Sequence, residues 1–252
     1  MFIEAAIDAL SAARRVAARD GVRGIVSRSL VHISDFRGAH RFLRTAATLD
    51  PQSLPGDVVD LVMSHRAVRP LQIKSEITQL AELVSGIRPR TALEIGTARG
   101  GTLFLFCRFA DPDALIISVD LPEGEFGGGY RKWRHGIYER FASSGQTILL
   151  IRADSHSPAT LDQVKGALGE RSLDFLFIDG DHSYEGAKRD FEMYLPLVRP
   201  GGLVALHDIV PHPATTGCEV DRFWREIRDR FCSREIVEDP HQGTKGIGLV
   251  WV

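Results

Sequence analysis

The sequence is short of the features that mark secreted, membrane-spanning or nucleic-acid-binding proteins. Its 252 residues include three cysteines, an odd number without metal-type spacing, so we expect reduced thiols and a cytoplasmic protein. No apolar run approaches the about 20 residues that a membrane span needs. Lysine and arginine (31) nearly balance aspartate and glutamate (33), so the chain lacks the basic character of a nucleic-acid-binding protein.

The chain does have the composition of a globular protein with a sizeable core. Apolar residues make up 44% and charged residues 25% of the sequence, and the length allows one large α/β domain with an added segment. Apolar residues at helical spacing, followed by a stretch that contains Pro51, Pro55 and Pro70, predict an N-terminal helical segment over residues 1–70. We interpret this segment as a cap or an oligomer contact rather than a substrate lid. A homo-oligomer is therefore expected, with the main domain at residues 71–252.

From residue 91 onward, apolar strands alternate with helices. The expected strands are residues 91–96, 115–120, 147–152, 173–179, 202–207 and 246–252, and the expected helices are residues 100–110, 131–143, 158–168, 184–195 and 219–231. This alternation predicts a doubly wound α/β fold with a mostly parallel sheet covered on both faces. In such sheets ligands bind beyond the carboxyl ends of the strands. The acidic residues expected at those ends are Glu94, Asp120, Asp154, Asp179 and Asp208.

A glycine-rich turn follows the first expected strand, in the stretch TALEIGTARGG. Gly96 and Gly100 flank the turn, and glycine lets a ligand approach the backbone closely. The helix that follows adds unpaired N–H groups and the positive end of its dipole. Asp120 ends the second strand about 20 residues further on, where a carboxylate can accept hydrogen bonds from ribose hydroxyls. The sequence therefore predicts a nucleoside-bearing cofactor over the ends of the first two strands.

The turn has the form E-x-G-x-x-x-G and lacks the G-x-G-x-x-G of Rossmann dehydrogenases. It resembles the first motif of the class I S-adenosylmethionine (SAM)-dependent methyltransferases, which implies a Rossmann-like sheet of seven strands and SAM as the cofactor. The turn would line the methionine part of SAM, Asp120 would bind the ribose, and Asp154 and Ser155 would lie near the adenine. The cofactor-binding residues implied are Glu94, Gly96, Thr97, Gly100, Asp120, Asp154, Ser155 and Asp179. The alternatives are a helix cap or loop carboxylate for Asp120 and an N-cap for Asp154.

A second polar cluster follows the fourth expected strand, in the stretch FIDGDHSYEG. It contains Asp179 and His182, and the fifth expected strand ends in His207 and Asp208. Neighbouring strands lie ~4.8 Å apart, so the two aspartates are expected to face one ion. A hard divalent cation such as Mg²⁺ prefers oxygen ligands of this kind. The alternative is that Asp179 and His182 only contact SAM and cap the next helix, without a metal.

The stretch IDGDHSYEGAKRDFEMYLPLVRPGGLVALHDI resembles the metal-dependent O-methyltransferases, in the group of cephalosporin hydroxylase-like proteins and sugar O-methyltransferases. The loop LPEGEFGGGYRKW also fits that group, and the resemblance covers residues 94–224. It implies metal ligands at Asp179 and Asp208, with His182 as the general base for an acceptor hydroxyl. His207 stands where these enzymes often carry an acidic or amide residue. We include it among the candidate ligands. Because imidazole suits transition metals better than Mg²⁺, three alternatives stay open: the site takes two carboxylates plus water, Asp181 also helps to bind the ion, or the ion is not Mg²⁺.

We therefore expect a SAM-dependent O-methyltransferase that acts on a hydroxyl of a small-molecule acceptor, a sugar or a natural product. The loops 124–133 and 211–218 are expected to face this acceptor, although ordinary loops have the same composition. Two other functions fit the sequence. One is a non-catalytic SAM-binding accessory protein, and the other is a Rossmann oxidoreductase, against which the missing G-x-G-x-x-G counts.

Overall fold

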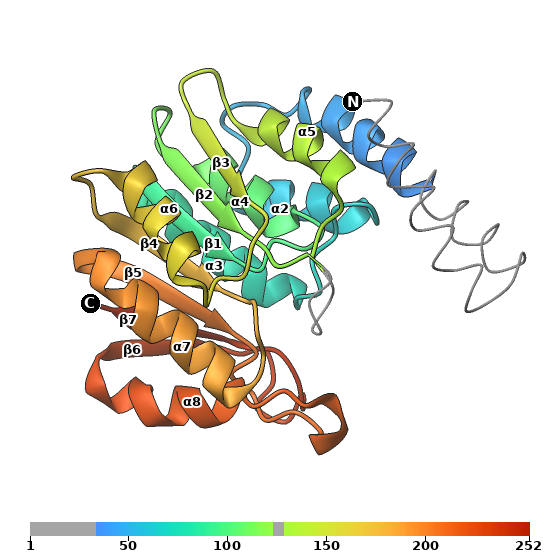
Figure 1. Cartoon of the computed structure of the whole chain (residues 1–252). Helices are drawn as coiled ribbons and strands as arrows, with labels where there is room; N and C mark the ends of the chain where they lie inside the picture. Colours follow the sequence, from blue (N-terminus) through green and yellow to red (C-terminus); the bar gives the residue numbers. More distant parts are fainter. Residues whose placement is uncertain (1–33, 123–128) are drawn as a thin grey trace, which may run out of the picture.

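Seven strands form one sheet in the order β3-β2-β1-β4-β5-β7-β6 (Figure 1). The computed structural model describes residues 34–122 and 129–252, so much of the predicted N-terminal helical segment and half of the loop 124–133 lie outside the described residues. The strands β1 to β5 pair in parallel, and β7 runs antiparallel to both β5 and β6. The doubly wound, mostly parallel sheet of seven strands that the sequence predicts is therefore confirmed.

The elements have the following bounds. The strands are β1 (Thr91–Ile95), β2 (Leu115–Val119), β3 (Thr147–Ile151), β4 (Leu173–Ile178), β5 (Val198–His207), β6 (Cys232–Ile236) and β7 (Ile247–Trp251). The α-helices are α2 (Pro55–Ser64), α3 (Lys74–Ile87), α4 (Gly101–Phe109), α5 (His135–Tyr138), α6 (Pro158–Leu168), α7 (Tyr184–Tyr194) and α8 (Val220–Ile227). A further helix covers residues 34–46.

Two elements differ from the sequence prediction. The strand β6 was not expected, because its segment CSREI lies at the sheet edge, is mostly exposed and has no apolar run. The helix expected over residues 131–143 is a short α-helix between two 3₁₀ turns. Gly136 weakens a regular helix there, and Arg134 and Tyr138 donate hydrogen bonds to the carbonyls of Ala67 and Ala98. These tertiary contacts tie the segment to the glycine turn.

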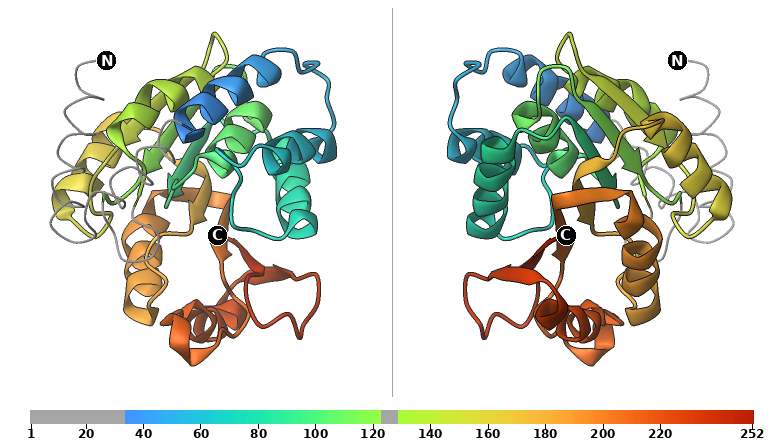
Figure 2. Two further views of the ribbon diagram at one scale, coloured as in Figure 1. Left: turned by 90° about the vertical axis from the view of Figure 1, so that its right-hand side faces the viewer. Right: turned by 90° about the vertical axis from the view of Figure 1, so that its left-hand side faces the viewer.

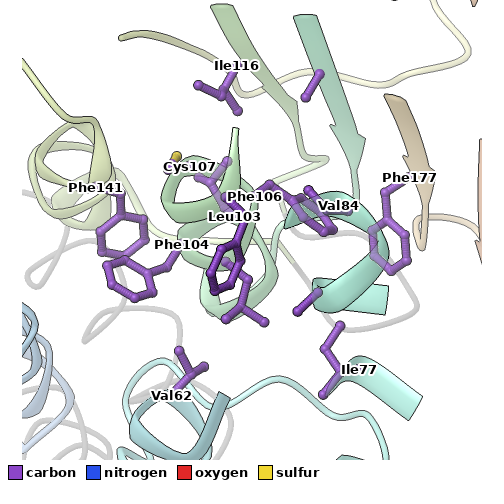
Figure 3. Close-up of a cluster of buried hydrophobic side chains, with 14 of the residues drawn as sticks. Val62, Ile77, Val84, Leu103, Phe104, Phe106, Cys107, Ile116, Phe141 and Phe177 are labelled. Carbon is purple, nitrogen blue, oxygen red and sulfur yellow. The ribbon is translucent and has the colours of Figure 1, made fainter. Parts of the chain in front are cut away.

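The apolar strands pack into helices on both faces of the sheet, as Figure 2 shows. Successive strand residues point to opposite faces, so Phe177 packs with α3 and α4 while Ile178 packs with α7 and α8. On the first face, shown in Figure 3, Val62 and Phe104 belong to the buried cluster. Phe42, from the helix at residues 34–46, lies edge-on to Phe104 with ring centroids 4.8 Å apart. Both faces are thus covered, which leaves the carboxyl ends of the parallel strands as the open edge.

Among the described residues, no helix is both long enough and apolar enough to cross a membrane.

Candidate active site

A cavity of about 590 Å³ opens at the carboxyl ends of strands β1 to β5. Of the residues predicted for the site, those that line the cavity are Gly96, Thr97, Gly100, Asp120, Asp154, Ser155, Asp179, His182, His207 and Asp208. Glu94 is the exception, because it is 1% exposed and is not among the lining residues. The described structure therefore brings the two predicted clusters into one cavity.

The glycine turn packs directly against the end of β4. Gly96 has a φ of +91°, and a Cβ built on it would lie 2.0 Å from the backbone oxygen of Asp179. Gly100, which precedes α4, has a φ of +80°, and its Cβ would lie 2.5 Å from Cε1 of Tyr138. Side chains other than hydrogen do not fit at these positions without a shift of the backbone or of Tyr138. The turn thus presents bare backbone to the cavity.

The carboxyl group of Glu94 is buried below this turn. Its Oε2 accepts a hydrogen bond of 2.7 Å from the Thr97 hydroxyl, whereas Oε1 has no partner among the described residues. The Thr97 hydroxyl also lies 2.6 Å from that of Ser118. Burial raises the pKa of Glu94 to about 8, and the carboxylates of Asp120 and Asp179 add to the shift. Glu94 is therefore mostly protonated at neutral pH in the ligand-free protein.

This shift makes a prediction for stability. Because the pKa of Glu94 is higher in the folded chain than in the unfolded chain, the folded state binds more protons between about pH 4.5 and pH 8. Its contribution to the free energy of unfolding is full below that range and falls as the pH rises through it. Between pH 5 and pH 8, we expect the free energy of unfolding of the native chain to fall by about 2–4 kcal/mol more than that of the Glu94→Gln variant. Urea unfolding of both proteins at the two pH values measures this, and an identical pH dependence would contradict it.

Asp120 joins the glycine turn to the segment after β2. Its Oδ2 accepts hydrogen bonds from the backbone N–H groups of Ala98 (3.2 Å) and Tyr130 (2.8 Å). Burial raises the pKa of Asp120 to about 6, so it is a carboxylate at neutral pH. The side chain is 7% exposed and lines the cavity beside the turn. This position, at the end of β2, is the one from which a carboxylate can reach a ribose.

Asp154 and Ser155 lie beyond the end of β3, at another part of the cavity lining. The Asp154 side chain accepts a hydrogen bond from the backbone N–H of His156, and the carbonyl of Ser155 accepts one from the Tyr194 hydroxyl. The N-cap of α6 is Ser157, so neither predicted residue has the N-cap role that the sequence left open. Both remain predictions as adenine contacts.

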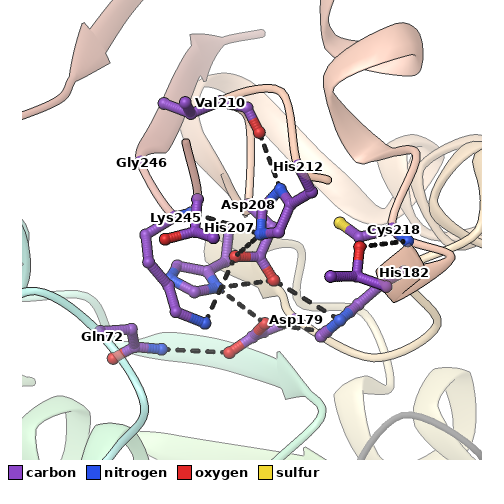
Figure 4. A network of polar contacts seen from close by, with 12 residues as sticks. Gln72, Asp179, His182, His207, Asp208, Val210, His212, Cys218, Lys245 and Gly246 are labelled. Atoms are coloured by element: carbon purple, nitrogen blue, oxygen red, sulfur yellow. Dashed lines mark hydrogen bonds and ion pairs between the residues drawn. The ribbon is translucent and has the colours of Figure 1, made fainter. Parts of the chain in front are cut away.

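Two aspartates and two histidines meet at the ends of β4 and β5 (Figure 4). His207 Nδ1 lies 3.0 Å from Asp179 Oδ1 and 3.3 Å from Asp208 Oδ2. On the other side, His182 Nε2 lies 3.3 Å from Asp179 Oδ1, and its Nδ1 lies 3.5 Å from Asp208 Oδ2. The N-cap of α7 is Ser183, which accepts a hydrogen bond from Gly186 N–H, so Asp179 and His182 do not cap that helix. The four side chains instead face one another at the cavity.

The charges of this cluster stabilise one another. Burial alone would lower the pKa of His207, but the carboxylates of Asp179 and Asp208 raise it to about 10. Burial opposes ionisation of the aspartates, yet the two histidines lower the pKa of Asp179 to about 2 and hold that of Asp208 well below its usual range. Burial would also lower the pKa of His182, but the carboxylates of Asp179 and Asp208 outweigh burial and raise this pKa. Without a metal, His207 is thus the cation between the two carboxylates.

Three further residues contact the cluster from distant parts of the chain. Gln72 Nε2 donates a 3.0 Å hydrogen bond to Asp179 Oδ2. Asp208 Oδ1 lies 3.2 Å from His212 Nε2 and 3.6 Å from Lys245 Nζ. Sequence reasoning missed Gln72 and Lys245, whereas His212 lies in the loop 211–218 that was expected to face the acceptor. They contact the outer oxygen of each carboxylate, the one that does not face His207.

A buried carboxylate positions Lys245. Glu76, on α3, is fully buried and accepts hydrogen bonds from the backbone N–H groups of Glu238 (3.1 Å) and Gly246 (3.0 Å) and from the Gln242 side chain (2.8 Å). These bonds fix the loop between β6 and β7, where Lys245 has a φ of +69°. The sequence signal for this role of Glu76 is a charged residue on the apolar face of α3, since a buried charged residue needs a partner.

Asp179, His207 and Asp208 suit a divalent metal. One ligand atom from each lies within 4.8 Å of the other two, and among the described residues His207 Nε2 is buried without a hydrogen-bond partner. Two carboxylates and one imidazole are common ligands of divalent ions. A bound ion would take the place of the proton on His207 Nδ1. The donor set of this chain therefore fits the metal that the resemblance implies.

The fold and this cavity define the class I methyltransferase architecture, and the comparisons agree. Residues 93–209 match the family model described as "Methyltransferase domain". This stretch contains the glycine turn and all four members of the aspartate–histidine cluster. Over residues 93–209 this match supports the methyltransferase resemblance seen in the sequence.

Two curated relatives align with parts of the chain. An uncharacterised protein, y4gI, of Sinorhizobium fredii is 28% identical over 172 residues, which cover 67% of this chain and 18% of the relative. The demethylmacrocin O-methyltransferase of Streptomyces fradiae is 29% identical over 96 residues, which cover 34% of this chain and 24% of the relative. The chain therefore matches a quarter or less of each relative's length.

Solved structures of O-methyltransferases share the fold. An O-methyltransferase from Bacillus cereus in complex with SAH superposes with a TM-score of 0.54 at 18% identity and covers 83% of this chain and 96% of that one. TomG from Streptomyces achromogenes, involved in tomaymycin synthesis and solved with SAM, has a TM-score of 0.52 at 18% identity, with coverage of 86% and 98%. At this identity the likeness shows the fold alone.

Proposed function

We propose that this chain is a SAM-dependent O-methyltransferase with a small-molecule acceptor. The observation that carries the proposal is the single cavity, in which a bare glycine turn and Asp120 lie beside a cluster of Asp179, His182 and Asp208. The turn and Asp120 supply the backbone and carboxylate contacts that a nucleoside cofactor needs. The O-methyltransferases with the same fold were solved with SAM or SAH, which supports SAM as this cofactor.

His182 is the proposed general base. Its two ring nitrogens face Asp179 and Asp208, which orient the ring and stabilise the imidazolium that forms when it takes the acceptor's hydroxyl proton. Burial would lower its pKa, but the two carboxylates outweigh burial and raise it. When bound, SAM would supply the methyl group to the acceptor oxygen and would leave as SAH. The displacement requires that donor and acceptor lie in line in the cavity.

Asp179, His207 and Asp208 are the proposed ligands of a divalent metal. When bound, such an ion lowers the pKa of the acceptor hydroxyl and orients it toward the methyl group. His207 is 3% exposed and Asp208 is 2% exposed, so both proposed ligands are packed within the protein. His182 is not one of these three proposed ligands.

We propose a sugar or natural-product hydroxyl as the acceptor. The demethylmacrocin O-methyltransferase aligns with this chain over 96 residues, which supports this acceptor class. Residues 1–70 are proposed to serve as a cap or a homo-oligomer contact beside the domain at 71–252, and the three unpaired cysteines support a cytoplasmic location.

The proposal is tested by incubating the protein with SAM that carries a labelled methyl group and a panel of glycosides and hydroxylated polyketides. The expected product is an ether-linked methyl group, stable to base, on at least one acceptor, together with one SAH for each methyl transferred. SAH binding without transfer to any acceptor of the panel would instead favour the non-catalytic accessory protein. Label on nitrogen or carbon would contradict an O-methyltransferase.

A further inference from the structure

We infer that the site formed by Asp179, His207 and Asp208 selects a divalent transition-metal ion, of the Mn²⁺ to Zn²⁺ series, over Mg²⁺. The inference rests on the proposed function, because it specifies the ion of the same site. It follows from three features of this chain: the inner ligand atoms, the contacts of the outer oxygens, and the burial of His207.

The inner ligand atoms have the spacing of an octahedral edge. Ligands about 2.1 Å from a metal and at right angles to each other lie about 3.0 Å apart. His207 Nδ1 lies 3.0 Å from Asp179 Oδ1 and 3.3 Å from Asp208 Oδ2. An ion can therefore bind to these three atoms with small adjustments of the side chains. The set has one nitrogen and two oxygens.

The outer oxygens of the two carboxylates differ in their contacts. Gln72 donates a hydrogen bond to Asp179 Oδ2, whereas Asp208 Oδ1 is buried without a hydrogen-bond partner among the described residues and lies 3.6 Å from Lys245 Nζ. Asp179 therefore has a single oxygen to offer the ion. This disfavours Ca²⁺, which takes six to eight oxygen ligands, often from bidentate carboxylates. Partners of this kind fix the orientation of ligating groups and tune the affinity for the metal.

The nitrogen ligand then separates Mg²⁺ from the transition metals. Mg²⁺ prefers oxygen ligands and usually keeps several waters, whereas imidazole suits the transition ions. His207 is 3% exposed, it follows the buried strand residue Leu206, and its Nδ1 lies between the carboxylates of Asp179 and Asp208. An ion at Asp179 and Asp208 must therefore accept the imidazole as a neighbour.

A second group of close ligand atoms is His182, Asp208 and Cys218. It shares Asp208 with the first group and is therefore the competing site for the ion. Cys218 would add a thiolate, which gives bound Co²⁺ a strong near-ultraviolet charge-transfer band. The absence of that band is therefore part of the expected result, and its presence would overturn the assignment to His207.

The test uses the full-length protein after removal of metal with a chelator. Titration with CoCl₂, MnCl₂ and MgCl₂, followed by calorimetry and by the visible spectrum of Co²⁺, is expected to show Co²⁺ and Mn²⁺ binding at least about tenfold more tightly than Mg²⁺. In the His207→Glu variant, whose three ligands are all oxygen, the preference should fall by about tenfold or more. His135→Glu, at a half-exposed position that does not itself line the cavity, is the matched control and should leave the preference unchanged.

Gln72→Leu provides a second readout that does not change a ligand. It is expected to weaken Mn²⁺ binding by about 10–100-fold, because Asp179 loses the group that orients it. The inference is overturned if Mg²⁺ binds the native protein as tightly as Mn²⁺, if His207→Glu leaves the preference unchanged, or if no ion binds. SAH titration of the same samples separates the two proposals: SAH binding without metal selectivity refutes only this inference, whereas loss of SAH binding refutes the proposed function.

Discussion

Replacing His182 with alanine is expected to lower turnover by about 10²–10⁴-fold while the affinity for SAH stays nearly the same. The reason is geometric. His182 lines the cavity and presents one ring nitrogen to each of Asp179 and Asp208, at 3.3 and 3.5 Å, whereas His207 contacts both carboxylates through Nδ1 alone. Its loss removes the proton acceptor, but it leaves the glycine turn and Asp120 in place for the cofactor.

Single-turnover measurements with labelled SAM, together with SAH calorimetry, check this prediction. The pH dependence of the rate is the decisive readout, since loss of a general base removes the rise in rate that accompanies deprotonation of the imidazole. His135→Ala, an exposed histidine paired with Glu139, is the matched control and should turn over at the native rate. A His182→Ala variant with native turnover would remove His182 from the base role.

Gly96→Ala is expected to have the largest effect on the cofactor site. The added Cβ would lie 2.0 Å from the backbone oxygen of Asp179, and the φ of +91° is unfavourable for alanine. The turn and the end of β4 must then move apart, so we expect a loss of about 2–4 kcal/mol in the free energy of unfolding. We also expect the affinity for SAH to fall by more than about 100-fold, because the turn and Asp179 both line the cavity.

Gly166→Ala is the control for this change, since it makes the same substitution in the last turn of α6, where an added Cβ meets nothing within 4 Å. It should be neutral or should stabilise the protein by about 0.5–1 kcal/mol. Urea unfolding and SAH calorimetry measure both variants. If Gly96→Ala unfolds and binds SAH as the native protein does, the turn does not have the close packing described here.

The sequence predicted the sheet and the position of the main site residues because both have local signals. Apolar strands alternate with helices, and a parallel sheet puts all its carboxyl ends at one edge. Gly96, Asp120, Asp179 and Asp208 each lie within two residues after a strand, so the topology alone brings them together. The structure places these four residues along one cavity, as that reasoning requires.

The residues that sequence reasoning missed lack such a signal. Gln72 reaches Asp179 across 107 positions of the chain, and Lys245 reaches Asp208 from an irregular loop. Their roles depend on the packing of α3 against the sheet and on Glu76, whose hydrogen bonds fix the loop. Contacts of this kind are set by tertiary packing rather than by local pattern. The edge strand β6 was missed for a related reason, because its polar segment gains strand structure from pairing with β7.

The central claim is that this cavity binds a SAM-type cofactor, and calorimetric titration with SAH tests it most directly. We expect saturable binding of one SAH per chain. This binding should be lost in the Gly96→Ala variant and retained in the His182→Ala and Gly166→Ala variants. NADH, titrated under the same conditions, is expected to give no binding heat. Binding of NADH without SAH would contradict the account and would identify the sheet as that of an oxidoreductase.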